Sequence, residues 1–327
     1  PDLYEIGMGN LAMKILYQIV NDHPSWACER VFAVAKDMEE FLKQNQIPLY
    51  TLENYTPLHQ LDILGFTIPY ELVYTNILSI LELGQIPLFS QERNEKHPFV
   101  IGGGPAMSNP EPMADFFDGF LIGEGETAMA EIIAVVENAK KQGAKRSETL
   151  KKLSEIKGFY VPSLVPVEYE ENNFYLKNSP EKIAKRVESD LNAVPSPTRF
   201  PIPWLKIAHN KGMVEVFRGC YHRCRYCQAG TYYKPVRERN PEKIQEAVRD
   251  LFYTTGEREF SLLSLSSGDY SLLPELMSNL NQEWKDNFVS FYLPSLKVNT
   301  FDLDLIEGLN AVRKSGITLA VETGSEK

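Results

Sequence analysis

The stretch Arg218-Gly-Cys-Tyr-His-Arg-Cys-Arg-Tyr-Cys-Gln-Ala-Gly230 places three cysteines, Cys220, Cys224 and Cys227, in a C-x3-C-x2-C pattern. Three thiolates from one short loop can hold a 4Fe-4S cluster whose fourth iron keeps an open position. An open iron can bind a substrate or cofactor directly, so the pattern indicates a catalytic cluster. A closed zinc site would need a fourth Cys or His, and His222 is the nearby candidate. The ligand count and the spacing favour the cluster.

The same loop resembles the cluster-binding loop of radical S-adenosylmethionine (SAM) enzymes, including an aromatic residue, Tyr226, directly before the last cysteine. The segment Gln228–Arg239 also resembles bacterial radical SAM proteins that carry a cobalamin-binding-like domain in front. The resemblance implies that SAM binds the open iron and that an electron from the cluster cleaves it to a 5′-deoxyadenosyl radical. It further implies an electron donor such as flavodoxin or ferredoxin.

From Lys206 onward, short apolar runs alternate with amphipathic stretches. The expected strands are Met213–Phe217, Glu259–Leu265, Phe288–Leu293 and Ile317–Val321, and the expected helices are Pro241–Thr255, Ser271–Trp284 and Asp302–Arg313. This alternation predicts four βα units of a barrel. The resemblance implies six, so residues 206–327 are interpreted as a partial TIM barrel of the radical SAM type, truncated at its C-terminal end.

The loops that follow barrel strands carry the sites of such folds. Ser267–Asp269 follows the second expected strand, where radical SAM enzymes have a Gly-Gly-Glu-like turn whose backbone meets the methionine amino group of SAM. A plain turn with a helix N-cap is the alternative. Ser295 and Lys297 are polar residues after the third strand, and Glu322 follows the fourth. The candidate SAM-binding residues that the resemblance implies are Tyr226, Ser267, Gly268, Asp269 and Glu322.

Residues 1–142 also alternate between strand and helix patterns. The expected strands are Glu29–Ala35, Leu61–Ile68, Phe99–Gly104 and Phe117–Gly125, and the expected helices include Asn10–Asn21, Glu71–Leu83 and Glu126–Lys141. Strands separated by helices predict an α/β domain with a doubly wound parallel sheet. Ligands of such sheets bind at the carboxyl ends of the strands.

Glycine-rich turns end two of these strands, Gly102–Pro105 and Gly123–Gly125, and Gly65 lies within a third. They resemble features of the cobalamin-binding domain found in front of many radical SAM enzymes. The candidate cobalamin-binding residues are Gly102, Gly103, Gly104 and Glu124. Plain tight turns are the alternative. The Asp-x-His-x-x-Gly motif of the best-known cobalamin domains is missing, because Asp22 and His23 are adjacent. Either cobalamin binds here without a histidine ligand on the lower face of cobalt, or this domain has lost cobalamin binding.

Residues 143–205 interrupt the alternation and predict a linker with a small β-hairpin, followed by a proline-rich connector. The expected hairpin consists of Gly158–Pro162 and Phe174–Leu176, with Val167–Tyr169 between them. Both ends of the chain resemble interrupted strands or loops, which predicts a piece of a longer protein. The 327-residue chain alone is therefore expected to bind SAM poorly, or to cleave it without turnover.

The formal net charge of -10 argues against a protein whose whole surface binds nucleic acid. Six basic residues nevertheless lie near the cysteines, either in structural roles or as a groove for an anionic ligand; they are Arg218, Arg223, Arg225, Lys234, Arg237 and Arg239. The fourth cysteine, Cys28, is interpreted as a small buried residue at the start of a strand. A thiolate-bound cluster favours the reducing cytoplasm, and no apolar run is long enough to span a membrane.

The favoured function is a radical SAM iron–sulfur enzyme that cleaves SAM reductively, with cobalamin-dependent methyl transfer to carbon as its reaction if cobalamin binds. A second hypothesis is a methylthiotransferase that modifies RNA or protein. Those enzymes carry three more cysteines in their first domain, where this chain has only Cys28. A third hypothesis is a non-catalytic redox or regulatory iron–sulfur protein, in which SAM neither binds the cluster nor is cleaved.

Overall fold

The structure is a computed structural model, which describes residues 1–165, 167–170, 173–176, 183–297, 309, 312 and 319–320. The chain divides into two compact units, Pro1–Glu188 and Ser189–Lys327. The boundary lies inside the segment that the sequence marks as a linker. Separate apolar clusters form the cores of the two units.

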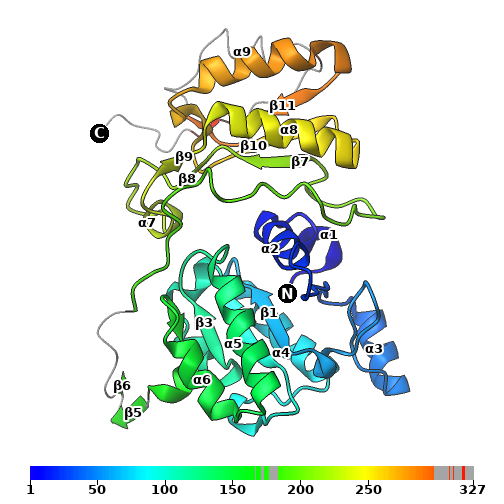
Figure 1. The fold of residues 1–327 in the computed structure, drawn as a ribbon, viewed down its shortest axis with the longest axis vertical. Helices are drawn as coiled ribbons and strands as arrows, with labels where there is room; N and C mark the ends of the chain where they lie inside the picture. The colour runs from blue at the N-terminus through cyan, green and yellow to red at the C-terminus, as the bar shows by residue number, and fades with distance from the viewer. Residues whose placement is uncertain are drawn as a thin grey trace. The chain divides into compact units, whose positions relative to one another are not determined.

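The first unit is built on a four-stranded sheet in the order β1-β2-β3-β4 (Figure 1). Strands β1 (Ile63–Thr67), β2 (Phe99–Gly103) and β3 (Gly119–Leu121) are parallel, and β4 (Phe159–Tyr160) is antiparallel to β3. The parallel part confirms the expected α/β sheet, with shorter strands than the apolar runs suggested.

Helices cover both faces of this sheet because side chains alternate along each strand. On one face, Leu64, Val100 and Phe120 belong to a core shared with α3 (Lys36–Asn45) and α4 (Tyr74–Leu83). On the other face, the core consists of strand residues Ile63, Phe99, Ile101 and Leu121 with side chains of α5 (Ala128–Gln142) and α6 (Arg146–Ser154). The layers confirm the doubly wound arrangement (Figure 1).

The expected amphipathic helix near the start is α2 (Leu11–Asn21), which follows the short α1 (Tyr4–Gly7). It begins at Asn10, whose side chain accepts a hydrogen bond from the backbone N–H of Met13 at 3.0 Å, as an N-cap does. Short 3-10 helices connect the larger elements of this unit: η1 (Leu58–Gln60), η2 (Glu71–Val73), η3 (Ser90–Glu92), η4 (Pro105–Ser108), η5 (Glu111–Phe116) and η6 (Pro162–Leu164).

The strand expected at Glu29–Ala35 is wrong. This segment is extended, but its one ladder contact is an isolated bridge between Ala33 and Leu3. Its first residues bond instead to the loop that follows α3: the backbone N–H of Arg30 donates to the Glu53 carboxylate at 2.7 Å. An apolar run becomes a strand only where a neighbouring strand supplies a ladder, and none does here among the described residues.

A hairpin is present in this segment, but its two strands are β5 (Val167–Glu170) and β6 (Asn173–Leu176), which pair antiparallel. Phe159 and Tyr160, which the sequence assigned to that hairpin, instead form β4 of the main sheet. Gly119 makes this pairing possible. A Cβ at this position would lie 2.3 Å from the Phe159 ring, so only a glycine in β3 leaves room for that ring.

The second unit contains a parallel sheet in the order β11-β10-β7, formed by β7 (Gly212–Glu215), β10 (Glu259–Leu263) and β11 (Ser290–Tyr292). Later in the chain, β12 (Leu296–Lys297) and β13 (Leu319–Ala320) form a separate parallel pair. These strands confirm the barrel-like alternation in sequence order. The helix expected at Asp302–Arg313 falls mostly outside the described residues.

Helices α8 (Pro241–Thr255) and α9 (Leu273–Trp284) cover one face of this sheet (Figure 1). The strand side chains in that core are Val214, Phe260, Leu262 and Phe291. Alternation places Met213, Glu215 and Leu263 on the opposite face, which corresponds to the inside of the partial barrel. Smaller elements complete the unit: β8 (Phe217–Arg218), α7 (Ala229–Tyr232), β9 (Arg237–Glu238), η7 (Ser267–Asp269) and η8 (Lys285–Asn287).

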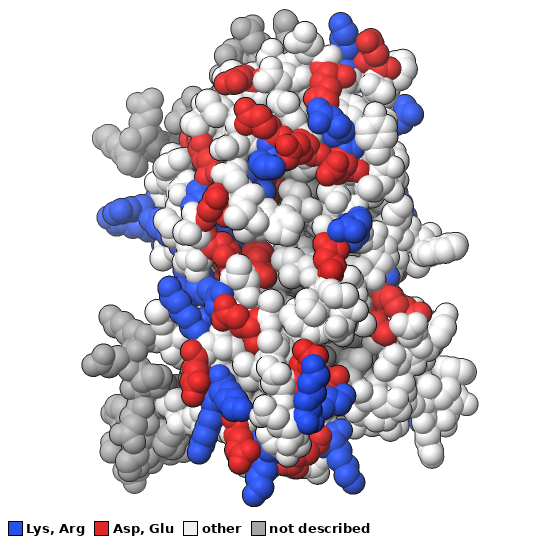
Figure 2. All heavy atoms as spheres, viewed as in Figure 1, with Lys and Arg blue, Asp and Glu red and all other residues white. Residues whose placement is uncertain are grey.

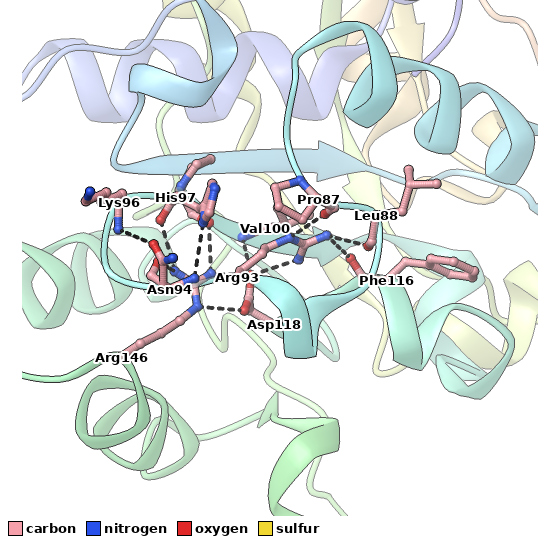
Figure 3. A network of polar contacts seen from close by, with 11 residues as sticks. Pro87, Leu88, Arg93, Asn94, Lys96, His97, Val100, Phe116, Asp118 and Arg146 are labelled. Carbon is pink, nitrogen blue, oxygen red and sulfur yellow. Dashed lines mark hydrogen bonds and ion pairs between the residues drawn. The ribbon is translucent and has the colours of Figure 1, made fainter.

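A buried ion-pair network lies at the amino edge of the first sheet (Figure 3). Asp118, directly before β3, accepts a hydrogen bond from Arg93 Nη1 at 3.0 Å, and its Oδ2 lies 2.8 Å from Arg146 Nη2. The same carboxylate oxygen accepts the backbone N–H of Val100 at 2.8 Å. The two guanidinium groups also donate to the carbonyls of Pro87, Leu88, Asn94, His97, Pro98 and Phe116. This network joins β2 and β3 to α6.

Acidic and basic side chains are interspersed on the face shown in Figure 2, so neither sign dominates the described atoms in view. Among the described residues, no helix has the length and apolar character needed to cross a membrane.

Candidate functional site

The cysteine loop begins where β7 ends, at the carboxyl edge of the second unit's sheet. β8 leads into the loop and pairs antiparallel with β9, which leaves it. Gly219 has φ +97°, and a Cβ there would lie 2.9 Å from the Tyr233 carbonyl oxygen and 3.0 Å from that of Pro235. Only glycine fits this turn, so the chain can enter Cys220 against the returning segment.

The three cysteines are free thiols, with Cys220 buried and Cys224 and Cys227 half-buried. The backbone N–H of Gly230 donates to Cys227 Sγ at 3.4 Å, and the N–H of Cys227 donates to the Cys224 carbonyl at 3.1 Å. Hydrogen bonds to cysteine sulfur are one means by which proteins set the potential of an iron–sulfur cluster. The three free thiols of this loop remain the predicted cluster ligands.

The zinc alternative gains no support from the arrangement. In the part of the chain that the structure describes, no three His, Cys, Asp or Glu side chains gather where a single metal ion could sit. A closed zinc site needs four ligands around one ion, whereas each thiolate of a 4Fe-4S cluster binds a separate iron, so the sulfurs surround a larger body. His222 Nε2 instead lies 2.7 Å from Asp269 Oδ2.

Asp269 joins the cysteine loop to the turn that follows β10. Its Oδ2 accepts hydrogen bonds from His222 Nε2 at 2.7 Å and from Ser266 Oγ at 2.6 Å, and Lys297 Nζ lies 3.9 Å away. Partial burial acts to raise the pKa of Asp269, but the bonds from Ser266 and His222 outweigh it and lower that pKa below its ordinary value. An ionised carboxylate only accepts, so the shared proton belongs to His222 Nε2.

Ser267 is fully buried and anchors the same turn. Its backbone N–H donates to the Ser295 carbonyl at 2.7 Å, and its hydroxyl lies 3.0 Å from Ser264 Oγ. The turn after β10 is thus bonded both to the segment after β11 and, through Asp269, to the cysteine loop. The cysteine loop, the turn after β10 and the segment after β11 therefore contact one another at the carboxyl edge of the described sheet.

The predicted SAM-binding residues have different surroundings. Ser267 and Asp269 are held by protein partners as just described, and Gly268 lies half-buried between them. Tyr226 is 73% exposed, so its side chain is open to a ligand or to solvent. Glu322 lies outside the described residues. A contact of any of them with SAM stays a prediction.

A second contact of the cysteine loop was not anticipated from the sequence. Tyr221 Oη donates to Glu238 Oε1 at 3.2 Å, and the Glu238 carboxylate also accepts the backbone N–H of Ser271 at 3.0 Å and the Ser271 hydroxyl. Burial and the Glu238 charge raise the pKa of Tyr221. Two consecutive loop residues, Tyr221 and His222, are therefore both linked to the region after β10.

Three of the basic residues near the cysteines have structural roles. Arg218 makes two hydrogen bonds of 2.9 Å to Glu215, and Arg239 donates to the carbonyls of Glu215 and Val194. Arg237 donates to the Pro235 carbonyl at 3.0 Å. Arg223 and Arg225 are exposed. The structural interpretation thus holds for the buried arginines.

The glycines of the first unit's glycine-rich turn have different surroundings: some are closely packed and others face open space. A Cβ on Gly102 would lie 2.8 Å from the Phe120 ring, and Gly104, at φ +120°, faces the Ile68 carbonyl at 2.6 Å. A Cβ on Gly103 would have its nearest neighbour at 3.9 Å, and one on Gly65 would meet nothing within 4 Å. Register and alternation place Gly65 and Gly103 on the same face of the sheet as Ile101, which packs against α5 and α6, so the open space around the two glycines is local.

Glu124, the fourth candidate cobalamin residue, is buried and accepts the backbone N–H of Glu188 at 2.6 Å. This bond gives it a structural role. The histidines of the first unit lie away from the carboxyl edge of the sheet: His59 and His97 precede β1 and β2, and His23 stacks on Trp26 at 3.7 Å between ring centroids. None of them follows the carboxyl end of a strand in this sheet.

Family models match most of the chain. A model described as the N-terminal part of radical SAM proteins matches residues 12–162, and a model of the radical SAM superfamily matches residues 214–327. The uncharacterised protein MJ0966 of Methanocaldococcus jannaschii is 26% identical over 306 residues, which cover 92% of this chain and 58% of that protein. The chain therefore spans less than two thirds of this relative.

Two solved structures share the fold. The radical SAM methyltransferase TsrM from Kitasatospora setae, with cobalamin and a 4Fe-4S cluster bound, is 13% identical with a TM-score of 0.57, covering 95% of this chain and 57% of TsrM. The cobalamin-dependent SAM radical enzyme OxsB, with aqua-cobalamin and SAM bound, is 14% identical with a TM-score of 0.58, covering 96% of this chain and 41% of OxsB.

Proposed function

We propose that this chain, which belongs to the radical SAM superfamily, is part of an enzyme that cleaves SAM reductively at a 4Fe-4S cluster held by Cys220, Cys224 and Cys227. The observation that carries this proposal is the 2.7 Å contact between His222, inside the cysteine loop, and Asp269, in the turn after β10. It brings the cluster loop and the expected SAM-binding turn together at the carboxyl edge of the partial barrel.

The cluster, when bound, supplies one open iron for SAM and the electron that cleaves it. The chain's own residues have the tasks of holding and shielding. The thiolates of the three cysteines would be the protein ligands, and the Gly230 N–H would donate to the sulfur of Cys227. The turn Ser266–Asp269 would form one wall of the SAM site, with its backbone toward the methionine end. A flavodoxin- or ferredoxin-like protein would supply the electron.

We propose further that the first unit binds cobalamin and that the reaction is methyl transfer to carbon. Support comes from the open space beside Gly65 and Gly103 and from the fold shared with two cobalamin-binding enzymes. The position of the histidines supports cobalamin without a histidine below cobalt, because none follows a strand at the carboxyl edge of the described sheet. When bound, cobalamin would carry the methyl group.

The test uses the natural full-length protein, purified without oxygen and with its cluster reconstituted. Incubation with SAM and a strong reductant should release 5′-deoxyadenosine and methionine, and added hydroxocobalamin should stay bound after desalting, near one cobalt per chain. SAM cleavage without retained cobalamin would reject the methyl-transfer proposal alone. A reconstituted cluster that neither binds nor cleaves SAM would reject the enzymatic proposal and leave a redox or regulatory role.

Replacing Gly65 with valine should weaken cobalamin binding without harming the fold. The side chain would enter the space beside Gly65 and Gly103, where steric conflict with a ligand costs about 1–3 kcal/mol, so the dissociation constant for cobalamin should rise roughly 5- to 150-fold. The melting temperature should not fall, because a Cβ at Gly65 meets nothing within 4 Å. The measurements are the corrin absorbance after desalting and a thermal melt.

Gly102→Ala is the matched contrast. Its added methyl group would clash with the Phe120 ring, so the variant should have a lower melting temperature. The fraction of the variant that stays folded should still retain cobalamin. Equal retention by the Gly65→Val variant and the wild type would show that this face is not the cobalamin site.

A further inference from the structure

We propose that Asp269 is a positioning residue that fixes the cysteine loop through His222. The sequence suggested a different role, in which the turn Ser267–Asp269 contacts SAM directly. The inference rests on the proposed function, because fixing this loop matters for a cluster that must keep one iron accessible.

The bond between the two residues is short and well supported. His222 Nε2 and Asp269 Oδ2 are 2.7 Å apart, and Ser266 Oγ donates to the same oxygen at 2.6 Å. Ser266 is itself buried, with 2% of its surface exposed, so it holds the carboxylate in one orientation. Hydrogen bonds around metal ligands fix the orientation of those ligands, and His222 lies between two of the proposed ligands, Cys220 and Cys224.

The turn that carries Asp269 is anchored on both sides. Before it, the buried Ser267 donates its backbone N–H to the Ser295 carbonyl at 2.7 Å. After it, Tyr270 Oη donates to the Arg239 carbonyl at 2.7 Å. Because the turn is bonded to the next strand segment and to the chain that leaves the cysteine loop, it offers a rigid point of attachment. Lys297, at 3.9 Å, adds a positive charge near the carboxylate.

The loop is held at two consecutive positions between the first two cysteines. Tyr221 donates to Glu238, which also accepts from Ser271, and His222 donates to Asp269. Cys220 before these contacts is buried, whereas Cys224 after them is half-buried. The contacts with Glu238 and Asp269 therefore restrict the part of the loop that leads to Cys224, and loss of the Asp269 contact should loosen Cys224 more than Cys220.

The first experiment needs no cluster. The full chain, in its metal-free reduced form, is treated with iodoacetamide, and alkylation of each cysteine is followed by mass spectrometry. Asp269→Ala and His222→Ala should each raise the alkylation rate of Cys224 by roughly 10-fold, the effect of losing one charge-assisted hydrogen bond. Asp269→Asn keeps an acceptor for His222 and should fall between. The double variant should react no faster than either single variant, because both remove the same bond.

Glu259→Gln is the control. Glu259 accepts a hydrogen bond from Tyr292 at 3.1 Å and lies 3.7 Å from Lys211, at the opposite edge of the same sheet. The Glu259→Gln substitution changes a comparable polar contact away from the cysteine loop. The alkylation rates of Cys220, Cys224 and Cys227 should therefore remain as in the wild type. A thermal melt of every variant checks that the second unit stays folded; if Asp269→Ala does not fold, His222→Ala and Asp269→Asn give the same comparison.

The second experiment uses the natural full-length protein with its cluster reconstituted. Asp269→Ala should shift the midpoint potential of the cluster, measured by a redox titration followed by electron paramagnetic resonance, while the signal should still change on adding SAM. Unchanged alkylation of Cys224, or additive effects in the double variant, would overturn the positioning role. Loss of the SAM-dependent change with wild-type alkylation and potential would instead make Asp269 a SAM contact. If the wild type binds no cluster, the proposed function fails, and the alkylation rates still decide the role of Asp269.

Discussion

Replacing any one of Cys220, Cys224 or Cys227 with alanine is expected to abolish the 4Fe-4S cluster. The loop offers three free thiols, and the imidazole of His222, the other possible ligand within the loop, is bonded to Asp269. A cluster left with two protein ligands has a second iron without a protein ligand, and it is then expected to be lost from the protein. Iron and sulfide per chain should drop from about four of each to near zero, as measured by colorimetric assay and by visible absorption after anaerobic reconstitution.

Two further variants make this expectation specific. Cys28→Ala should keep the full iron content, because burial and the nearby Glu53 carboxylate raise the pKa of Cys28 to about 11, so it remains a neutral thiol at pH 7. His222→Ala should also retain iron, since that imidazole bonds to Asp269. Loss of metal in the His222 variant, with one zinc per chain in the wild type, would restore the zinc interpretation. A full iron complement in any of the three cysteine variants would remove that residue from the ligand set.

The features that the sequence predicted correctly are those that depend on residues close together in the chain. Alternation of apolar runs and amphipathic stretches located β1, β2, β10 and β11, because each strand must bury side chains on a face that a helix covers. The cysteine spacing located the loop for the same reason, since all its ligands lie within one short segment.

Interactions between distant segments could not be read in this way. His222 and Asp269 are 47 residues apart, and nothing in either local pattern indicates the other. His222 drew notice only as a zinc ligand, and Asp269 only as part of a SAM-binding turn. Their contact follows from parallel strands whose carboxyl ends meet at one edge, which predicts the neighbourhood but not the bond.

The glycines show a similar limit. In the sequence, Gly102, Gly103 and Gly104 form one motif, but in the structure each has its own surroundings: the Phe120 ring, open space and the Ile68 backbone. Glu29–Ala35 fails for a related reason, because its pattern is typical of a strand while its backbone partners belong to a loop. Side-chain pattern predicts which faces are apolar, and packing decides which backbone lies beside them.

Asp118→Asn is expected to be the most destabilising single substitution considered for the first unit. The Asp118 side chain is 2% exposed and carries the negative charge between the guanidinium groups of Arg93 and Arg146, which are 0% and 8% exposed. Asparagine keeps the size and one acceptor but leaves two buried positive charges side by side. Removing one partner of a buried ion pair costs about 3–5 kcal/mol, a large part of a typical stability of about 5–15 kcal/mol.

The melting temperature of the first unit should therefore fall by roughly 6–20 °C, at about 2–4 °C per kcal/mol for a unit of this size. Asp62→Asn is the matched control, because Asp62 pairs with Lys140 at the surface, where both side chains are more than half exposed, and such pairs contribute at most about 1 kcal/mol. Adding Arg146→Met to Asp118→Asn should recover part of the loss, since it removes one uncompensated charge. Equal melting temperatures for Asp118→Asn and Asp62→Asn would show that the network's carbonyl acceptors, rather than the carboxylate, hold the two arginines in place.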